Sequence, residues 1–416
     1  MKLLLVTLHF PPSVGGGVQR PLKFATHLPA YGIETHVLAP EHHEQLPDAE
    51  PVLPTQAWIH RVRYVGPSKR KPVELLAGKE GLERLRTQVA LQGRRLLVPD
   101  ENVPWSVAVL PAALRIARRE QIDVVLTTSP PGSLHFVGAA VQKATGAKWV
   151  ADVRDSLVDM LHRRTRESAL VRAKEKTSAG VARLIASRAD ATVTAADFIS
   201  EEMRALNPRG PVVTITNGCD FDDFAGMEHH ASDVLRIVHT GFMFPGRDLR
   251  PFLRAFAAAN LQDAVVRFVG DFRAEDRALA EELGIGDRVE ALGHVSRRRS
   301  LELQRDSEVL LLEVPDADGR GAGVPSGKLF EYLAAERPIL AAVPPEGVAA
   351  QLVRDTGAGI VAAPDDVEGL RAGIVELHER WRAGRLDGPP LSPEWRDKLS
   401  RASRVEELAD LLRSLE

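Results

Sequence analysis

One cysteine, Cys219, is present among the 416 residues. A single thiol cannot build a disulfide framework or a thiolate zinc cluster within one chain. Because free cysteines are among the most frequently buried residues, we expect Cys219 to be a buried side chain of the core. Scarce cysteine also fits a reducing compartment, so we expect a cytoplasmic protein.

Long hydrophobic runs and an excess of charge are also missing. The apolar stretch from Leu3 to Leu8 is shorter than the hydrophobic region of a signal peptide and far shorter than the roughly 20 residues of a membrane-spanning helix. We expect it to be a buried strand. The formal net charge is −3, which disfavours a general nucleic-acid-binding protein. Hydrophobic residues make up 44% and charged residues 27% of the chain, as in ordinary globular proteins.

Short, continuous apolar runs alternate with helical patterns along the chain. Such runs are typical of parallel strands buried on both faces, and their alternation with helices predicts a doubly wound α/β sheet. The expected strands cover residues 2–8, 123–127, 149–152, 191–194 and 212–215, and the expected helices between them cover 19–31, 106–119, 134–145 and 177–189.

The same order of elements begins again at Leu235 and predicts a second α/β domain. Its expected strands are residues 235–239, 264–269, 289–291 and 308–312, its expected helices are 249–259, 275–283 and 326–335, and residues 339–342, 348–355 and 359–361 continue the series. We therefore expect domains at residues 1–216 and 235–388, a linker at 217–234 because Asn-Gly and acidic segments favour turns, and an amphipathic helix at 390–416.

A glycine run, Gly15-Gly16-Gly17, lies between the first expected strand and the helix that follows. Glycines let the backbone approach a phosphate or sugar closely, and a helix start offers unpaired N–H groups to an anion. The run is not a G-x-G-x-x-G fingerprint and lacks its acidic ribose partner. A phosphate-binding loop and a flexible turn both remain open.

A second candidate site is the segment from Pro325 to Glu331, at the start of an expected helix. Ser326 is a good N-cap, the N–H groups of Gly327 and Lys328 would face an anion, and the Lys328 ammonium group suits a phosphate. Glu331 follows three residues later on the same side of the helix, and its carboxylate could accept two hydrogen bonds from vicinal hydroxyls. The alternative is a capped helix with a Lys–Glu surface pair.

Other candidates occur singly. Arg247 follows the first strand of the second domain and could stabilise a leaving phosphate. Arg154 and Asp155 end a strand, where open α/β sheets collect their active sites. His135 lies near a helix start, where a lone histidine is more often structural. No combination of histidines and acidic residues has the character of a metal site, so we expect neither a metal nor another cofactor.

In their joint order and spacing, these segments resemble the retaining glycosyltransferases of the GT-B fold, specifically glycosyltransferase family 4. The similarity runs through nearly the whole chain. It is carried by Phe10-Pro11-Pro12, Gly15-Gly16-Gly17 and Arg20, by Thr128-Ser129-Pro130-Pro131 and His135, by Val150-Ala151-Asp152-Val153-Arg154-Asp155, by Asn217-Gly218-Cys219-Asp220, by Pro325-Ser326-Gly327-Lys328-Leu329-Phe330-Glu331-Tyr332-Leu333-Ala334 and by Thr356-Gly357-Ala358-Gly359.

The resemblance implies two Rossmann-like domains facing a cleft, an acceptor-side N-terminal domain on which the tail helix packs, and a C-terminal domain that binds a nucleotide sugar. It implies catalytic roles for Arg247, Lys328 and Glu331, the last on the ribose hydroxyls, and for His135, on the donor sugar. The implied donor-binding residues are Gly16, Gly17, Gly293, Val295, Ser326, Gly327 and Leu329, and the implied acceptor-side residues are Arg154 and Asp155.

Two positions depart from the family pattern. Phe242 stands where many members have arginine, and Gly323 stands where many have glutamate, eight residues before Glu331. These departures leave the identity of the donor sugar open. The expected reaction is the metal-independent, retaining transfer of a sugar from a nucleoside diphosphate sugar, for which UDP is the expected carrier, to a hydroxyl acceptor. A nucleotide-sugar epimerase of the same fold and a catalytically silent binding subunit are the alternatives.

The acceptor could be a sugar, a lipid-linked molecule or a small metabolite, and no nucleic-acid partner is expected. A basic stretch could hold the enzyme peripherally on anionic lipid at the inner membrane face. A solvated helix face is the alternative, because Glu167 and Glu175 interrupt the charge. The basic residues are Arg163, Arg164, Arg166, Arg172, Lys174, Lys176 and Arg183. The oligomeric state does not follow from the sequence.

Overall fold

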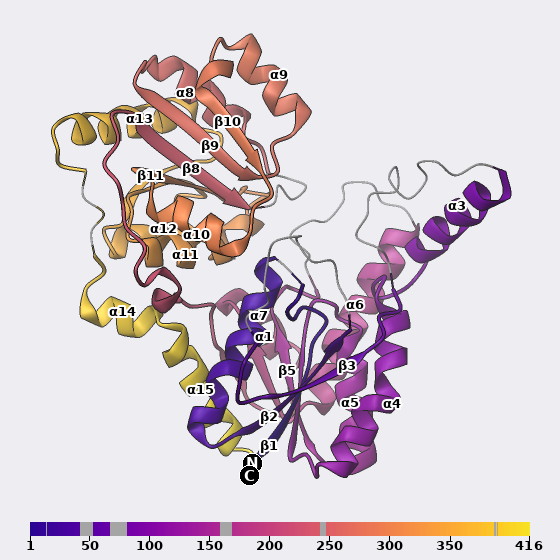
Figure 1. Cartoon of the computed structure of the whole chain (residues 1–416). Helices are drawn as coiled ribbons and strands as arrows, with labels where there is room; N and C mark the ends of the chain where they lie inside the picture. Colours follow the sequence, from indigo (N-terminus) through magenta and orange to yellow (C-terminus); the bar gives the residue numbers. More distant parts are fainter. Residues whose placement is uncertain are drawn as a thin grey trace. The chain divides into compact units, whose positions relative to one another are not determined.

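A computed structural model describes residues 1–13, 15–41, 53–66, 81–158, 169–241, 247–386, 388 and 390–416, and it divides into two compact units. The first unit consists of residues Met1–Thr216 and Val405–Glu416, and the second unit consists of Asn217–Arg404. Each unit is built on its own parallel sheet with helices between the strands (Figure 1). The expectation of two Rossmann-like, doubly wound domains is confirmed.

A seven-stranded parallel sheet forms the middle of the first unit, in the order β3-β2-β1-β4-β5-β6-β7. The strands are β1 (Lys2–Val6), β2 (Glu34–Pro40), β3 (Trp58–Val62), β4 (Val124–Thr128), β5 (Lys148–Val153), β6 (Ala191–Thr194) and β7 (Val212–Thr214). The helices are α1 (Gly16–His27), α3 (Gly81–Arg95), α4 (Val103–Arg119), α5 (Leu134–Thr145), α6 (Ala169–Arg188), α7 (Asp197–Arg204) and the part of α15 (Arg401–Arg413) that begins at Val405.

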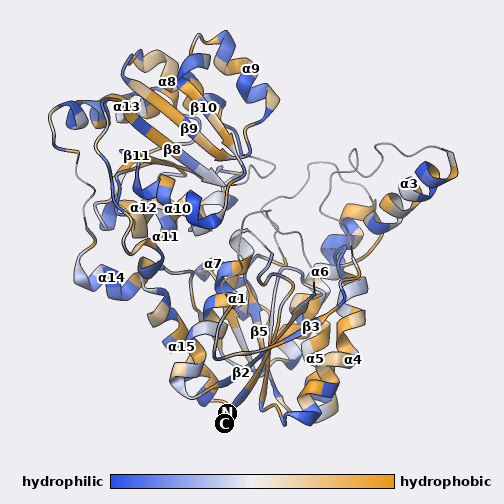
Figure 2. Ribbon diagram, in the orientation of Figure 1, coloured by the Kyte–Doolittle hydropathy of each residue, from blue (hydrophilic) through white to orange (hydrophobic). Residues whose placement is uncertain are grey.

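The central strand β1 is buried on both faces, which explains its unbroken run of apolar residues. Leu3 and Leu5 pack with Phe24 of α1 and with Leu408 of α15 on one face. Leu4 and Val6 pack with residues of α4 and α5 on the other face. Figure 2 shows the hydrophobic colours along these strands. The apolar tail therefore completes the core of the first unit.

A six-stranded parallel sheet forms the second unit, in the order β10-β9-β8-β11-β12-β13. The strands are β8 (Leu235–Gly241), β9 (Ala264–Gly270), β10 (Val289–Gly293), β11 (Val309–Glu313), β12 (Ile339–Ala342) and β13 (Gly359–Ala362). The helices are α8 (Arg250–Ala259), α9 (Ala274–Glu282), α10 (Arg297–Arg305), α11 (Gly327–Ala335), α12 (Val348–Asp355), α13 (Val367–Arg382) and α14 (Pro393–Leu399).

Some predicted elements have the expected bounds and others differ. Helix α5 and strand β6 begin and end where the sequence predicts. Strands β2 and β3 were not predicted; β3 is only partly buried and lies at the edge of its sheet, so its apolar pattern is weak. Helix α1 begins earlier than expected, at Gly16, because the glycine run forms its first turn.

Two further regions differ in detail from expectation: residues 217–234, which connect the two sheets, and the C-terminal tail. Residues 217–234 group with the second unit and contain a short helix, η2 (Phe221–Phe224). The expected single tail helix is two helices, α14 and α15, with residues 390–404 in the second unit. Cys219 is buried, as predicted, and its N–H donates to the carbonyl of Leu399 at 2.7 Å. Among the described helices, none is both long and apolar enough to cross a membrane.

A buried ion pair joins α1 to the carboxyl end of β5. Arg20 is 2% exposed and Asp152 is fully buried. The Arg20 guanidinium donates to the Asp152 carboxylate at 2.7 Å, and it also donates to the carbonyls of Ile215 and Thr216. The hydroxyl of Thr128, at the end of β4, donates to Asp152 at 2.7 Å. Four segments of the first unit therefore meet at one pair of charges.

The Arg20–Asp152 pair gives a prediction for stability. Arg20→Met leaves the Asp152 carboxylate buried without its cation, so we expect the free energy of unfolding of the first unit to fall by about 3–5 kcal/mol. Urea unfolding followed by circular dichroism measures it. The matched control is Arg119→Met, which removes an exposed ion pair with Glu120 and should change the stability by less than about 1 kcal/mol. Equal effects of the two substitutions would contradict the assignment.

Candidate functional site

Charged side chains gather in the second unit at the carboxyl ends of β8 and β11, beside the start of α11. Lys328 is the second residue of α11, Glu313 is the last residue of β11, and Arg247 comes shortly after β8. Open α/β sheets bind ligands at this edge. The sequence singled out Lys328 and Arg247 but did not predict that Glu313 would join them.

Lys328 is turned inward against β8. Its Nζ lies 3.0 Å from Nε2 of His239, a fully buried residue of β8. Gly241 makes room for the lysine stem, because a Cβ at this position would lie 2.7 Å from the Cε of Lys328. Burial first, and then the charge of Arg247, holds the pKa of Lys328 well below its usual range. An anion that binds beside Lys328 would therefore raise this pKa and favour the protonated, positively charged amine.

Arg247 and Glu313 form a second buried pair beside Lys328. The Nε of Arg247 lies 3.4 Å from Oε2 of Glu313, and both side chains are largely buried. Burial raises the pKa of Glu313 to about 7, against the opposing effect of Arg247 and Lys328. The Arg247 guanidinium thus faces a carboxyl group that is only partly ionised near neutral pH, which leaves positive charge for an anionic ligand.

Ser326 occupies the N-cap position of α11, as predicted, but without the predicted hydrogen bond. Among the described residues, its side chain caps no N–H of the helix. Its φ is 55°, whereas a capping serine needs an extended backbone. The Leu329 side chain is buried in the core and its N–H donates to the carbonyl of Ser326 at 3.2 Å. Gly327 begins the helix between them.

Glu331 pairs with an arginine that the sequence did not single out. Nη1 of Arg297, the first residue of α10, donates to Oε1 of Glu331 at 2.5 Å, and Nη2 donates to Asp223 at 2.9 Å. Burial lowers the pKa of Arg297, but Glu331 and Asp223 raise it above its usual range. The alternative of a Lys328–Glu331 surface pair is wrong, because Lys328 turns to His239 instead.

The run Arg297-Arg298-Arg299, which begins two residues after the loop from Gly293 to Val295, is the signal in the sequence that could have identified Arg297. In the structure Gly293 has a φ of 68°, a value that favours glycine, and ends β10. Val295 packs against the core of the second unit. Ser296 then caps α10 by accepting a hydrogen bond from the N–H of Arg299. The loop is therefore fixed at both ends and leads directly into Arg297.

In the first unit, Arg154 contacts the glycine run at the start of α1. Its Nη1 donates to the carbonyl of Gly17 at 2.9 Å. A Cβ at Gly17 would lie 3.2 Å from the His9 ring and 3.3 Å from the Arg154 guanidinium, whereas one at Gly16 would meet nothing within 4 Å. Asp155 is exposed. The structure thus brings the predicted Gly17 and Arg154 together.

His135 lies in the first turn of α5 and is fully buried. Its Nδ1 is 2.9 Å from the hydroxyl of Thr127, which also accepts a hydrogen bond from the indole of Trp149. Burial lowers the pKa of His135 to about 4, so the ring is neutral. Within the described parts of the chain, Nε2 has no hydrogen-bond partner. The carboxylate of Asp100 holds the loop before α5 by accepting from the N–H of Ser133.

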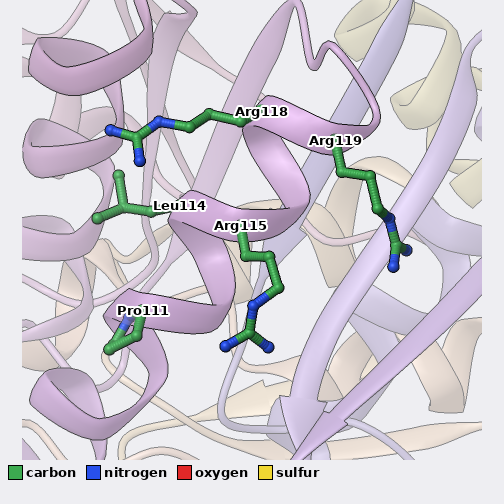
Figure 3. A pocket seen from close by; sticks show the side chains of 5 residues that line it. All are labelled: Pro111, Leu114, Arg115, Arg118 and Arg119. Atoms are coloured by element: carbon green, nitrogen blue, oxygen red, sulfur yellow. The ribbon is translucent and has the colours of Figure 1, made fainter.

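The basic residues of the predicted membrane-binding stretch belong to α6 or lie outside the described residues. Arg172, Lys174, Lys176 and Arg183 belong to α6, while Arg163, Arg164 and Arg166 lie outside the described residues. An open hollow of about 670 Å³ along α4 is lined by Pro111, Leu114, Arg115, Arg118 and Arg119. Figure 3 shows these five side chains. Because Arg119 ends α4 before β4 begins, this hollow lies near the amino ends of the strands of the first unit, away from Arg154 and Asp155 after the carboxyl end of β5.

Two family models match the sequence and together cover most of it. The model of the glycosyl transferase 4-like domain matches residues 15–218, and the model of glycosyl transferases group 1 matches residues 235–380. No sequence among curated proteins matches this chain. The boundary between the two matches falls where the sequence pattern begins again.

Solved structures share the fold over nearly the whole chain. Sucrose-phosphate synthase from Thermosynechococcus elongatus aligns with a TM-score of 0.65 at 16% identity and covers 100% of this chain and 98% of its own. Anabaena Alr3699/HepE in complex with UDP-glucose aligns at 0.63 and 13%, over 100% of both chains. A glycosyltransferase from Rickettsia africae aligns at 0.62 and 14%, over 99% and 98%. At these identities the likeness shows the fold alone.

The raised pKa of Glu313 predicts a pH dependence of stability. The folded protein holds a proton on Glu313 up to about pH 7, whereas the usual value is 4.5, so the unfolded chain releases that proton first. Stability is therefore lost as the pH rises through this window, by about 3 kcal/mol in total. Glu313→Gln should match the wild type at pH 5 and be more stable at pH 8 in urea unfolding.

Glu308→Gln is the matched control for this pH dependence. Burial raises the pKa of Glu308, but hydrogen bonds from Arg236 lower it below its usual value. Its charged form stabilises the fold, so Glu308→Gln should be less stable than the wild type at pH 8. The same sign of change for both variants would contradict the Glu313 assignment.

Proposed function

This chain is a GT-B glycosyltransferase of the group 1 family, and we propose that it transfers a sugar from a nucleoside diphosphate sugar to a hydroxyl acceptor with retention of configuration, as family 4 enzymes do. The observation that carries the donor assignment is the inward-facing cluster of Lys328 and Arg247 beside the start of α11. Two cations and a helix start suit a diphosphate better than a neutral sugar or a peptide.

The diphosphate would lie against Lys328, Arg247 and the N–H groups at Ser326 and Gly327. Glu331 would bind the ribose hydroxyls, because its carboxylate retains lone pairs beyond those that Arg297 occupies. The loop from Gly293 to Val295 would lie against the base. UDP is the proposed carrier; Alr3699/HepE, which has the same fold, was solved with UDP-glucose.

Retention is proposed to follow from attack on the same face of the sugar that the diphosphate leaves. The acceptor hydroxyl forms the new glycosidic bond while the bond from the sugar to the phosphate oxygen breaks, and the leaving phosphate takes the hydroxyl proton. Lys328 and Arg247 would stabilise the charge that develops on that phosphate. These cations would make a metal ion unnecessary.

The first unit is proposed to contribute the other side of the reaction. Gly16 and Gly17 would approach the donor, and His135 would contact the donor sugar through the nitrogen that does not face Thr127. Arg154 and Asp155 would serve the acceptor. The proposed acceptor is a sugar, a lipid-linked molecule or a small metabolite. A lipid-linked acceptor would bring the basic residues of α6 to the cytoplasmic face of an anionic inner membrane.

The proposed function is tested by thermal-shift measurements with UDP, GDP, TDP and ADP. A ligand that binds the folded state raises the melting temperature, and we expect UDP to do so. Glu331→Ala should keep the fold but lose most of this shift, and it should lower sugar transfer from the matching nucleotide sugar by about 100-fold or more. Glu368→Ala, an exposed carboxylate on α13, is the control. The absence of any shift, or epimerised donor in place of transferred sugar, would overturn the proposal.

Metal independence is tested by chelation. Transfer should persist in excess EDTA, because protein cations are proposed to neutralise the leaving diphosphate. The initial rate is measured with and without EDTA, and then with added magnesium or manganese. Complete loss of transfer in EDTA with recovery on adding either ion would contradict this part of the proposal.

A further inference from the structure

We propose that His239 is a positioning residue of the donor site, which holds the terminal nitrogen of Lys328 in place by accepting a hydrogen bond from it. The inference rests on the proposed function, in which Lys328 binds the donor diphosphate. It concerns a fully buried histidine of β8 that the sequence motifs do not single out.

The hydrogen bonds of His239 fix which ring nitrogen carries the proton. Nδ1 lies 2.9 Å from the carbonyl oxygen of Leu311, on the neighbouring strand β11. A carbonyl only accepts hydrogen bonds, so Nδ1 must carry the proton. Nε2 of the neutral ring then presents a lone pair to the Nζ of Lys328, at 3.0 Å. The backbone of β11 therefore sets the tautomer that the lysine needs.

The aliphatic chain of Lys328 is held in place, as is its terminal nitrogen. Gly241, at the end of the same strand, has a φ of 107° and leaves the space that the Cε of Lys328 fills. A lysine side chain otherwise has several rotatable bonds and loses much conformational entropy on binding a ligand. With its stem over Gly241 and its nitrogen on His239, Lys328 has lost most of that freedom before the diphosphate arrives.

The charges of four residues act on Lys328. Arg247 follows β8, Glu313 ends β11, Asp271 follows β9, and Glu331 belongs to the same helix. A protonated histidine would add a further cation here. Burial and then the charge of Lys328 hold the pKa of His239 well below its usual value, so the ring stays neutral and keeps accepting.

The hydrogen bond is tested without any ligand by nitrogen-15 NMR of the histidine side chains. The resonances of His239 are assigned by their loss in His239→Gln. We expect the neutral, Nδ1-protonated tautomer, and we expect Lys328→Met to shift the Nε2 resonance because it removes the donor. An Nε2-protonated ring, or an Nε2 resonance that Lys328→Met leaves in place, would overturn the proposal.

The consequence for binding is tested by calorimetric titration with UDP. His239→Phe keeps a ring of similar size but accepts no hydrogen bond, and we expect it to weaken UDP binding by about 10- to 100-fold, the range for a lost hydrogen bond to a charged group. His239→Gln should recover most of this loss, because its amide oxygen reaches the place of Nε2. The matched control is His378→Phe in the same unit, which removes a hydrogen bond to Asp263 and should leave UDP binding unchanged.

The NMR measurement and the UDP titration distinguish a failure of this inference from a failure of the proposed function. A wild-type protein that binds no nucleoside diphosphate overturns the proposed donor site and with it the positioning role, whatever the NMR shows. A wild-type protein that binds UDP no more tightly than His239→Phe overturns the positioning role and leaves the donor site standing. If His239→Phe does not fold, His239→Gln and Lys328→Met still decide the contact through the NMR measurement.

Discussion

The first unit depends on the burial of one ion pair at the carboxyl edge of its sheet. Arg20 and Asp152 lie away from water, and a charge in that place is tolerated only when it is paired and hydrogen-bonded. The Arg20 guanidinium also donates to the carbonyls of Ile215 and Thr216, and the Thr128 hydroxyl satisfies the carboxylate. The orientation of α1, and hence of the glycine run at its start, is fixed by this requirement.

The second unit buries charge at the corresponding edge but does not neutralise it as fully. Lys328 lies against a neutral histidine, and the carboxyl group of Glu313 is only partly ionised near pH 7. The cost of this arrangement is offset by the apolar side of α11, where Leu329 and Tyr332 are fully buried. Incomplete electrostatic pairing at a site whose helix otherwise packs well is typical of a functional site.

Much of the fold could be predicted from the sequence, because buried parallel strands are continuous apolar runs. Strands β1, β4, β5 and β6 were predicted for this reason, while β3 was missed because its residues at the sheet edge are half-polar. The start of α11 was predicted from Pro325 and Ser326. The partners of Lys328 and Glu331 were not predicted, because His239 lies within an apolar strand and Arg297 belongs to another helix, so no local spacing relates either residue to the site.

The pairing of Arg297 shows why local spacing does not predict the partner of Glu331. Three residues along a helix bring two side chains to one side, but that pairing competes with partners from other elements. Arg297 contacts Glu331 on α11 and Asp223 in η2 together, so its planar guanidinium gains two charged hydrogen bonds. A ligand that forms hydrogen bonds with Glu331 in place of Arg297 would still leave Arg297 paired with Asp223. The network therefore allows Glu331 to change partners without leaving an uncompensated buried charge.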